Sequence, residues 1–167
     1  MTKADQDDAT VAAEVPSGFV LMDKGLGFGD HLQPFYRRVI AQDSSLGFVV
    51  GPQHLNLMGI CHGGALMTLA DMAAAVSLHV RRDKPRPAPT INLSFDFMSP
   101  GLPGHWLQTR TDHVDMKRRF GFTSGVVLDG DAVIMRYSGT FFLPSAESPL
   151  GSNPGAMNRL IGDDAPL

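Results

Sequence analysis

The hydrophobic and polar positions of the chain change their period several times, and each change predicts a different element. Residues 34–42 and 46–51 are short runs rich in β-branched and aromatic side chains, separated by Asp43-Ser44-Ser45. Such runs around a polar triplet predict a β-hairpin. A loop with three glycines follows at 53–64. Residues 65–80 are rich in Ala, Leu and Met and contain no Gly or Pro, which predicts a helix.

Four further strands are predicted after this helix. Residues 90–98 alternate strictly between the two faces of a strand, with Ile91, Leu93, Phe95 and Phe97 on one face and Thr90, Asn92, Ser94 and Asp96 on the other. The segments 105–115, 120–128 and 132–143 follow. The last two are expected to form a hairpin around Asp129-Gly130-Asp131, because Asp-Gly favours positive φ. Two strands, one helix and four strands predict an α+β fold with a largely antiparallel sheet.

The predicted helix 65–80 is hydrophobic nearly all round, which is typical of a buried helix. A membrane-spanning helix is excluded because the apolar stretch is short and contains Asp71. One strongly curved sheet could cover such a helix. Asp71 is the only charged residue between positions 60 and 80. It either belongs to a narrow solvated stripe with Thr68, Ala75 and His79, or it is a carboxylate held in an apolar site as a general base or nucleophile.

The loop before the helix carries a second candidate group. Paired glycines at Gly63 and Gly64 would let another group approach the backbone closely. The first N–H groups of a helix have no internal partner, and the helix dipole adds partial positive charge there. These N–H groups could therefore hold an oxyanion. The alternative interpretation of the same residues is an ordinary tight turn.

Gly63 and Asp71 stand eight positions apart, which is about 12 Å along one helix. A reacting carbonyl group needs its attacker and its hydrogen-bond donor each within about 3 Å. One helix can hardly supply both groups to one carbonyl. Two antiparallel helices from two subunits can, so the spacing predicts a dimer with two equivalent sites, provided that both residues act.

The combined spacing Asn56-x5-His62-Gly63-Gly64-x6-Asp71, with Thr90 and Met98-Ser99-Pro100 after it, resembles the hot-dog-fold acyl-CoA thioesterases. Within them it is most similar to the group of the phenylacetate-degradation thioesterase, over residues 34–143. The resemblance implies a curved antiparallel sheet of about five to six strands wrapped around one long central helix. It also implies hydrolysis of an acyl-CoA to free acid and CoA without metal or redox cofactor, by a dimer or dimer of dimers.

By this resemblance, Asp71 is the catalytic carboxylate, acting as general base or as nucleophile. The backbone N–H of Gly63 would polarise the thioester carbonyl, and Asn56 and His62 would shape that end of the site. Thr90 falls where relatives carry a Ser or Thr that helps to place the water molecule.

Two clusters of basic residues are candidates for binding the phosphates of CoA. One follows the helix and the other lies between two strands; they comprise Arg81, Arg82, Lys84 and Arg86, and Lys117, Arg118 and Arg119. An otherwise acidic chain needs local positive charge to receive CoA. We expect substrate contacts at the second cluster and at Arg82, with Gly64 beside the polarising N–H. The alternative is a helix end and loops that are simply solvated.

Composition excludes several other classes. The 167 residues suit one domain, expected at 17–143 between a flexible arm at 1–16 and a mostly irregular tail at 144–167. A net charge of −3 disfavours nucleic acid as a partner. The single cysteine, Cys61, excludes an internal disulfide and a cysteine-based zinc site. The acidic start lacks the basic and apolar regions of an export signal, so we expect a cytoplasmic protein without membrane partners.

Other residues carry weaker alternatives. Cys61 is more typical of a small packed residue than of a nucleophile, because no orienting group is evident. His62 as a base would suit a hot-dog dehydratase or hydratase acting on enoyl- or hydroxyacyl-CoA, and a non-catalytic acyl-CoA-binding module is a third possibility. Four histidines without metal-ligand spacing are expected on the surface or in loops: His31, His54, His105 and His113. Four apolar side chains either line an acyl pocket or pack in the core: Phe28, Phe35, Tyr36 and Met58.

Overall fold

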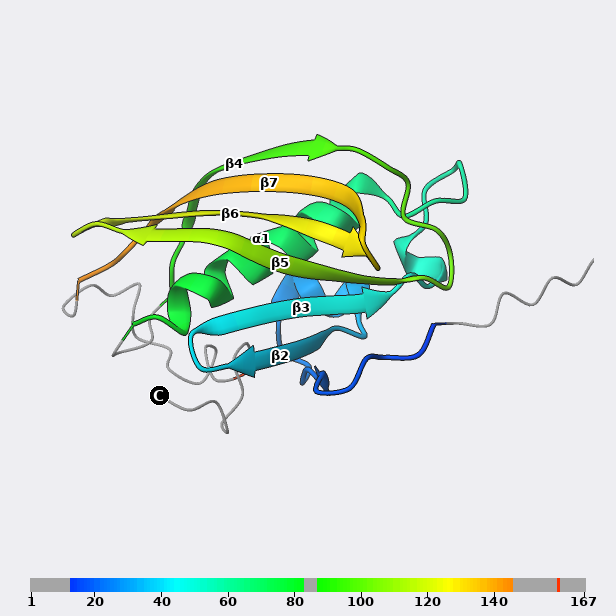
Figure 1. Ribbon diagram of the computed structural model, residues 1–167, viewed down its shortest axis with the longest axis horizontal. Coiled ribbons are helices and arrows are strands. Elements are labelled where there is room, and N and C mark those ends of the chain that lie inside the picture. Colours follow the sequence, from blue (N-terminus) through cyan, green and yellow to red (C-terminus); the bar gives the residue numbers. More distant parts are fainter. Residues whose placement is uncertain (1–12, 83–86, 146–158, 160–167) are drawn as a thin grey trace, which may run out of the picture.

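An antiparallel sheet curves around one long helix in the computed structural model, which describes residues 13–82, 87–145 and 159 (Figure 1). Within these residues the sheet has seven strands in the order β1-β2-β3-β5-β6-β7-β4. The strands are β1 Val20–Leu21, β2 Tyr36–Ile40, β3 Asp43–Val49, β4 Thr90–Phe97, β5 Trp106–Met116, β6 Phe120–Asp129 and β7 Ala132–Phe142. The helices are α1 Gly63–His79 and the short 3-10 helices η1 Gly27–Leu32 and η2 Pro52–His54.

The predicted α+β hot-dog architecture is confirmed. The sheet exceeds the expected five to six strands because the two-residue strand β1 pairs with β2 at one edge. The 3-10 helix η1 was not predicted. Residues 1–12 of the expected N-terminal arm and most of the expected tail lie outside the described residues, whereas the Ala13 N–H donates to the Gly104 carbonyl at 2.7 Å.

Helix α1 is buried on most of its circumference, as its composition predicted. Its buried residues include Leu66, Leu69, Ala70, Ala73 and Val76, which join one core cluster with side chains of β3, β5, β6 and β7. Fully burying one leucine of this kind stabilises the fold by about 1.5–3 kcal/mol. The helix begins two residues before the predicted start, because His62 caps it and both glycines adopt helical geometry.

The predicted turn of the first hairpin is wrong by two residues. The strands β2 and β3 are joined by Ala41 and Gln42, and Ala41 has a φ of 52°. Ser44 and Ser45 instead lie buried in β3. The Ser45 hydroxyl donates to the Thr109 carbonyl of β5 at 2.5 Å, so a polar side chain is satisfied inside the sheet. The second hairpin is confirmed, with Gly130 at a φ of 56°.

Strand β4 lies at one edge of the sheet. Among the described residues it pairs only with β7, where Thr90 is opposite Phe141 and Phe97 is opposite Met135. The start of β4 therefore lies at the same end of the sheet as the start of β6, since Phe120 is opposite Phe142. No helix in the described ranges is long and apolar enough to cross a membrane.

Candidate active site

Asp71 lies in the middle of α1 and is held by the first residue of β4. The Thr90 hydroxyl donates a hydrogen bond to Asp71 Oδ1 at 2.7 Å. Thr68, Asp71 and Ala75 are half-buried, as the stripe interpretation expects, but His79 is only 1% exposed, so the stripe ends before it. The carboxylate is therefore within reach of solvent, on a helix face that the core leaves uncovered, and one of its oxygens is already hydrogen-bonded.

The first turn of α1 leaves one backbone donor unused. The His62 ring accepts the Gly64 N–H at Nδ1 (2.8 Å), and the His62 carbonyl accepts the Ala65 and Leu66 N–H groups. The Gly63 N–H donates to no acceptor among the described residues. This single unpaired donor lies at the positive end of the helix dipole, which suits an oxyanion. The Gly64 N–H, in contrast, is already committed to His62.

A tight loop at 55–61 leads into this turn. Asn56 Oδ1 accepts the N–H groups of Met58 (2.9 Å) and Ile60 (3.3 Å), and the Asn56 N–H donates to the Ile60 carbonyl at 2.9 Å. Gly59 has a φ of 74°, which favours glycine at this turn. Because the side-chain oxygen of Asn56 is used within the loop, only its NH2 group remains to donate to a ligand.

Asn56 and Gly63 line a pocket of about 510 Å³ at this end of the molecule. The other lining residues are mostly apolar and include the sequence 97–101: Ile60, Cys61, Leu66, Phe97, Met98, Ser99, Pro100 and Gly101. A Cβ atom on Gly63 would lie 3.2 Å from the Phe97 ring, a tight contact that the ring would have to relieve by a shift of a few tenths of an ångström. The motif Met98-Ser99-Pro100 therefore forms part of the pocket wall.

The structure gathers the expected site residues into two groups within one chain. Asp71 and Thr90 form one group, and Asn56, His62 and Gly63 form the other. Because Gly63 and Asp71 lie on the same regular helix, about 12 Å of helix axis separates them. These two groups of expected site residues, the half-sites, are therefore too far apart within one chain to contact one carbonyl group together.

Two alternative catalytic groups lose support from their surroundings. Cys61 is 4% exposed, and burial raises the pKa of its thiol to about 12, so the thiolate is scarce at neutral pH. Cys61 accordingly packs in the core. His62 Nδ1 accepts the Gly64 N–H, so this nitrogen is not free to act as a base.

The remaining histidines are not all superficial. His31 and His113 are exposed, and His105 is half-buried with Nδ1 2.6 Å from Asp129 Oδ2. The expectation is wrong for His54, which is fully buried. Its ring accepts the Gly51 N–H, and its other nitrogen contacts the Leu32 carbonyl, a partner 22 residues away that no local pattern reveals. No group of three potential metal ligands occurs among the residues described.

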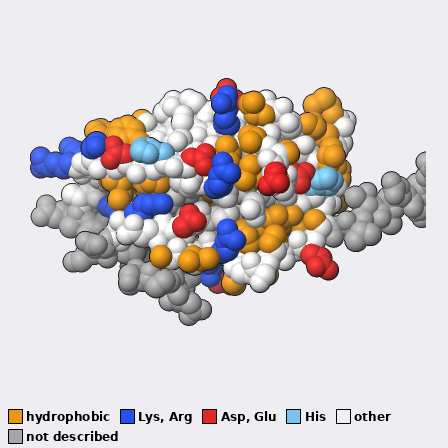
Figure 2. Space-filling view, in the orientation of Figure 1, with side chains coloured by type: hydrophobic (Ala, Val, Ile, Leu, Met, Phe, Trp, Pro, Cys, Tyr) orange, Lys and Arg blue, Asp and Glu red, His pale blue; other side chains and the backbone are white. Residues whose placement is uncertain are grey.

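The basic residues between β5 and β6 lie at the tip of that hairpin, where Figure 2 shows Lys and Arg side chains gathered at one end of the molecule. All three residues of this cluster, Lys117, Arg118 and Arg119, are exposed. Lys117 Nζ lies 2.8 Å from Asp115 Oδ2, and the Arg119 guanidinium lies over the Phe142 ring. The tip lies at the Thr90 end of the sheet.

The first basic cluster follows α1. Arg81 donates to the Ser77 carbonyl at 2.9 Å, which fits the helix-end alternative, and Arg82 is half-buried. Lys84 and Arg86 lie outside the described residues.

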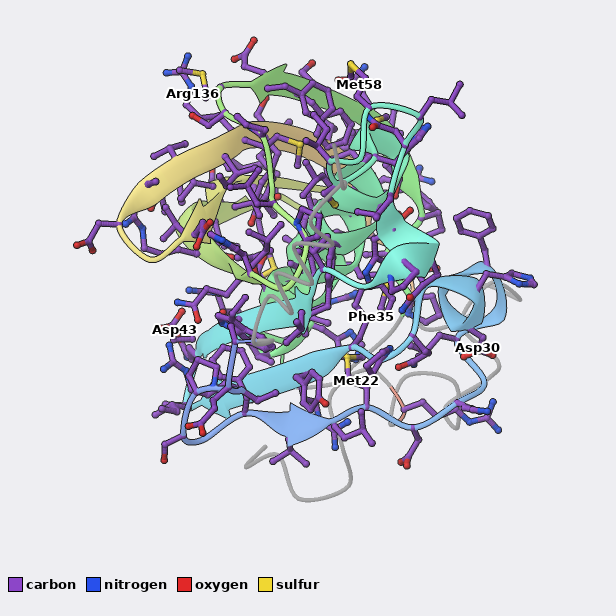
Figure 3. All side chains as sticks on the ribbon, turned by 90° about the vertical axis from the view of Figure 1, so that its right-hand side faces the viewer. Met22, Asp30, Phe35, Asp43, Met58 and Arg136 are labelled. Atoms are coloured by element: carbon purple, nitrogen blue, oxygen red, sulfur yellow. The ribbon has the colours of Figure 1, made fainter. Side chains whose placement is uncertain are left out.

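None of the four apolar candidates for an acyl pocket lines the pocket described above. Phe35 is fully buried against Phe48, and Tyr36 packs against Trp106, so these two are packing residues. Phe28 and Met58 are exposed, and Figure 3 shows Met58 and Phe35 well apart. The wall of this pocket is instead formed in part by the segment 97–100, at the end of the alternating strand β4. The sequence pointed to it only through the motif Met98-Ser99-Pro100.

Comparisons with known proteins agree with this geometry. The family model of the thioesterase superfamily matches residues 58–135. A Pseudomonas aeruginosa protein, PA0474, that is named as a candidate esterase is 32% identical over 131 residues, which cover 78% of this chain and 98% of that protein. A mutant of the phenylacetic acid degradation protein PaaI from Thermus thermophilus superposes with a TM-score of 0.62 and 25% identity, covering 71% of this chain and 99% of that one. The BH2602 protein from Bacillus halodurans, solved with CoA, superposes with a TM-score of 0.59 and 22% identity, covering 65% and 74%.

Proposed function

Because the chain belongs to the thioesterase superfamily, we propose that it hydrolyses an acyl-CoA thioester to a free acid and CoA. The observation that carries the proposal is the pairing of Asp71 with the Thr90 hydroxyl, together with the unpaired Gly63 N–H at the head of the same helix. These are a base or nucleophile and an oxyanion donor, the two groups that acyl transfer requires.

In the proposed reaction the Gly63 N–H donates to the thioester oxygen while negative charge develops there. Asp71 either takes a proton from the attacking water or attacks the carbonyl carbon itself, forming an anhydride that water then hydrolyses. In both routes the C–S bond breaks and the CoA thiolate leaves and takes up a proton. Thr90, which donates its proton to Asp71, keeps oxygen lone pairs that can accept from the water.

The two half-sites would meet in a homodimer. Thr90 at one end of β4 binds Asp71, and Phe97 at the other end lies against Gly63. If two β4 edges pair antiparallel about their centre, Thr90 stands opposite the partner subunit's Phe97, and the partner's Gly63 comes close to Asp71. The open edge of β4 and its exposed Ile91 (55%) and Phe97 (53%) support this pairing.

The charge and polarity of the surface suggest how the substrate would lie. Lys117, Arg118 and Arg119 are at the Thr90 end of the sheet, where they could receive the phosphates of CoA. The pocket beside Gly63 has a mostly apolar wall, which favours an uncharged, apolar acyl group. The similar fold of the Bacillus halodurans protein, solved with CoA, is compatible with this binding mode.

The test is release of free CoA thiol from a panel of aryl, short-chain and long-chain acyl-CoAs. The proposal expects thiol release that is lost in Asp71→Asn. Hydration of an enoyl-CoA without thiol release would instead indicate a hydratase, although the occupied Nδ1 of His62 disfavours it. Binding without any turnover would indicate an acyl-CoA-binding module. Either result would overturn the thioesterase assignment.

A further inference from the structure

His54 is a fully buried polar side chain outside the two half-sites. Its Nδ1 accepts the Gly51 N–H at 2.9 Å, and its Nε2 lies 2.8 Å from the Leu32 carbonyl, to which it can only donate. One nitrogen accepts and the other donates, so the ring is the neutral tautomer with its proton on Nε2. Burial lowers the pKa of His54, which agrees with the neutral form. The ring also lies on Phe48 of β3, with centroids 4.2 Å apart.

These contacts fix the backbone of His54 on two sides. The His54 N–H donates back to the Gly51 carbonyl at 2.9 Å, so the turn from Gly51 to His54 is closed by both its backbone and its side chain. The Nε2 contact joins this turn to the end of η1. The ring is therefore a cross-link between three separate parts of the chain: η1, the η2 turn and β3.

The backbone of His54 in turn holds the head of α1. Its carbonyl accepts the His62 N–H at 2.7 Å, and the neighbouring residues Leu55 and Cys61 form a β-bridge. These contacts close the loop that carries Asn56. Since His62 is the N-cap of α1, the next N–H along the chain is that of Gly63. One backbone hydrogen bond and one peptide unit thus connect the His54 residue to the proposed oxyanion donor.

We infer that His54 is a positioning residue that holds the Gly63 N–H and the Asn56 amide in register for the reaction, an inference that rests on the proposed thioesterase function. Proline is the one substitution that removes a backbone N–H, so residues such as His54 offer the way to displace the Gly63 N–H while keeping it. Because the contribution of an oxyanion donor depends on its placement at the developing charge, a displaced Gly63 N–H lowers kcat rather than substrate affinity.

If His54 has only a packing role, the variants are expected to rank differently in activity. Leu resembles His in volume and keeps the apolar contact with Phe48, but it makes neither hydrogen bond. Gln keeps an amide that can donate to the Leu32 carbonyl. If packing alone matters, His54→Leu retains more activity than His54→Gln. If the hydrogen bonds position the loop, His54→Gln retains more than His54→Leu.

The experiment measures kcat and KM for CoA release, and hydrogen–deuterium exchange of peptides spanning 55–66, in the full-length protein. It compares wild type with His54→Gln, His54→Leu and the control His113→Gln, an exposed histidine on β5 away from the pocket. We expect His54→Leu to lower kcat about tenfold or more, a fraction of the effect of deleting a donor, with KM within about twofold. Exchange over 55–66 should accelerate in the order wild type, Gln, Leu, and the control should match wild type.

An unchanged kcat with unchanged exchange in folded His54→Leu would overturn the inference, as would higher activity in His54→Leu than in His54→Gln. If His54→Leu does not fold, His54→Met, whose side chain also makes neither hydrogen bond, decides by the same two readouts. If wild type releases no CoA from any substrate, the thioesterase proposal fails on that result, and the exchange data alone decide whether His54 holds the loop.

Discussion

The Thr90 hydroxyl donates a hydrogen bond of 2.7 Å to the Asp71 carboxylate, joining the edge strand β4 to the middle of α1. This bond orients a carboxylate that has no basic partner among the described ion pairs. Removing it should leave Asp71 in place on the helix but free to rotate. Substitutions of Thr90 test that consequence.

Thr90→Val keeps the shape of the side chain and deletes the hydroxyl. We expect kcat to fall about tenfold or more, because a hydrogen bond to a charged group contributes about 1.5–3 kcal/mol. Thr90→Ser, which keeps the hydroxyl, should stay within about threefold of wild type on the same scale. The measurement is steady-state thiol release by the two variants. Equal rates for Thr90→Val and Thr90→Ser would show that the Thr90 hydroxyl does not contribute to catalysis.

Asp71→Asn keeps the size of the side chain and an oxygen that can accept from Thr90, but removes the negative charge. Turnover should fall at least about 100-fold, the scale of losing a general base, while circular dichroism and melting temperature stay near those of wild type. A variant with near wild-type hydrolysis would show that another group attacks the thioester. Single turnover in oxygen-18 water distinguishes the two routes, since only the nucleophilic route labels the Asp71 carboxylate.

Replacing Lys117, Arg118 and Arg119 together with Ala should raise KM for acyl-CoA more than it lowers kcat, because these residues would hold a remote part of the substrate. The effect should shrink as salt is added. The control is Arg110→Ala with Arg136→Ala, two exposed cations on strands β5 and β7. An unchanged KM at low salt would move CoA binding to the cluster after α1.

Mixing two inactive variants tests whether a site is shared between chains. Asp71→Asn removes one half-site, and Gly63→Val fills the space 3.2 Å from the Phe97 ring at the other. A mixed dimer holds one site with both defects and one with neither. With equal amounts of the two variants, random exchange makes half the dimers mixed, so activity should return to at most about a quarter of wild type if the sites act independently.

Two controls accompany the mixing experiment. Each parent must fold, which thermal unfolding shows, and mass-tagged subunits must demonstrate exchange. If exchange is complete between folded parents and no activity returns, Gly63 and Asp71 do not serve one site from different chains.

Cys61 should resist alkylation in the folded protein at pH 8. Its thiol is buried and its pKa is raised to about 12, so the reactive thiolate becomes abundant only near or above that pH. Mass spectrometry after iodoacetamide should show unmodified protein with full activity, and complete modification after unfolding in guanidinium. Rapid modification of the native protein with loss of turnover would return Cys61 to the list of catalytic candidates.

The elements best predicted from the sequence are those whose local pattern and tertiary environment agree. Helix α1 is apolar nearly all round because the sheet covers most of it, and β4 alternates because only one of its faces meets the core. The Asp129-Gly130-Asp131 turn followed from the positive φ that glycine allows at its centre.

Features that depend on distant partners were missed. Ser44 and Ser45 suggested a turn, but Ser45 donates to Thr109, 64 residues away, and is satisfied inside a strand. His54 was expected on the surface or in a loop, but its ring is buried and forms hydrogen bonds with the Gly51 N–H and the Leu32 carbonyl. The residues of the two half-sites were found through their joint spacing, whereas the pocket wall depends on how the segment after β4 folds back against Gly63.

The regular geometry of α1 also limits how the gene can change. An insertion or deletion of one residue between Gly64 and Asp71 would turn the carboxylate by about 100° and shift it by about 1.5 Å relative to the helix head. A deletion would place the carboxylate where the fully buried Ala70 now lies, and an insertion where Met72 packs against the core, so in both cases Asp71 would lose Thr90. Length changes in the connection between α1 and β4 carry no such penalty, so insertions among relatives should concentrate there while the six-residue spacer from Gly64 to Asp71 keeps its length.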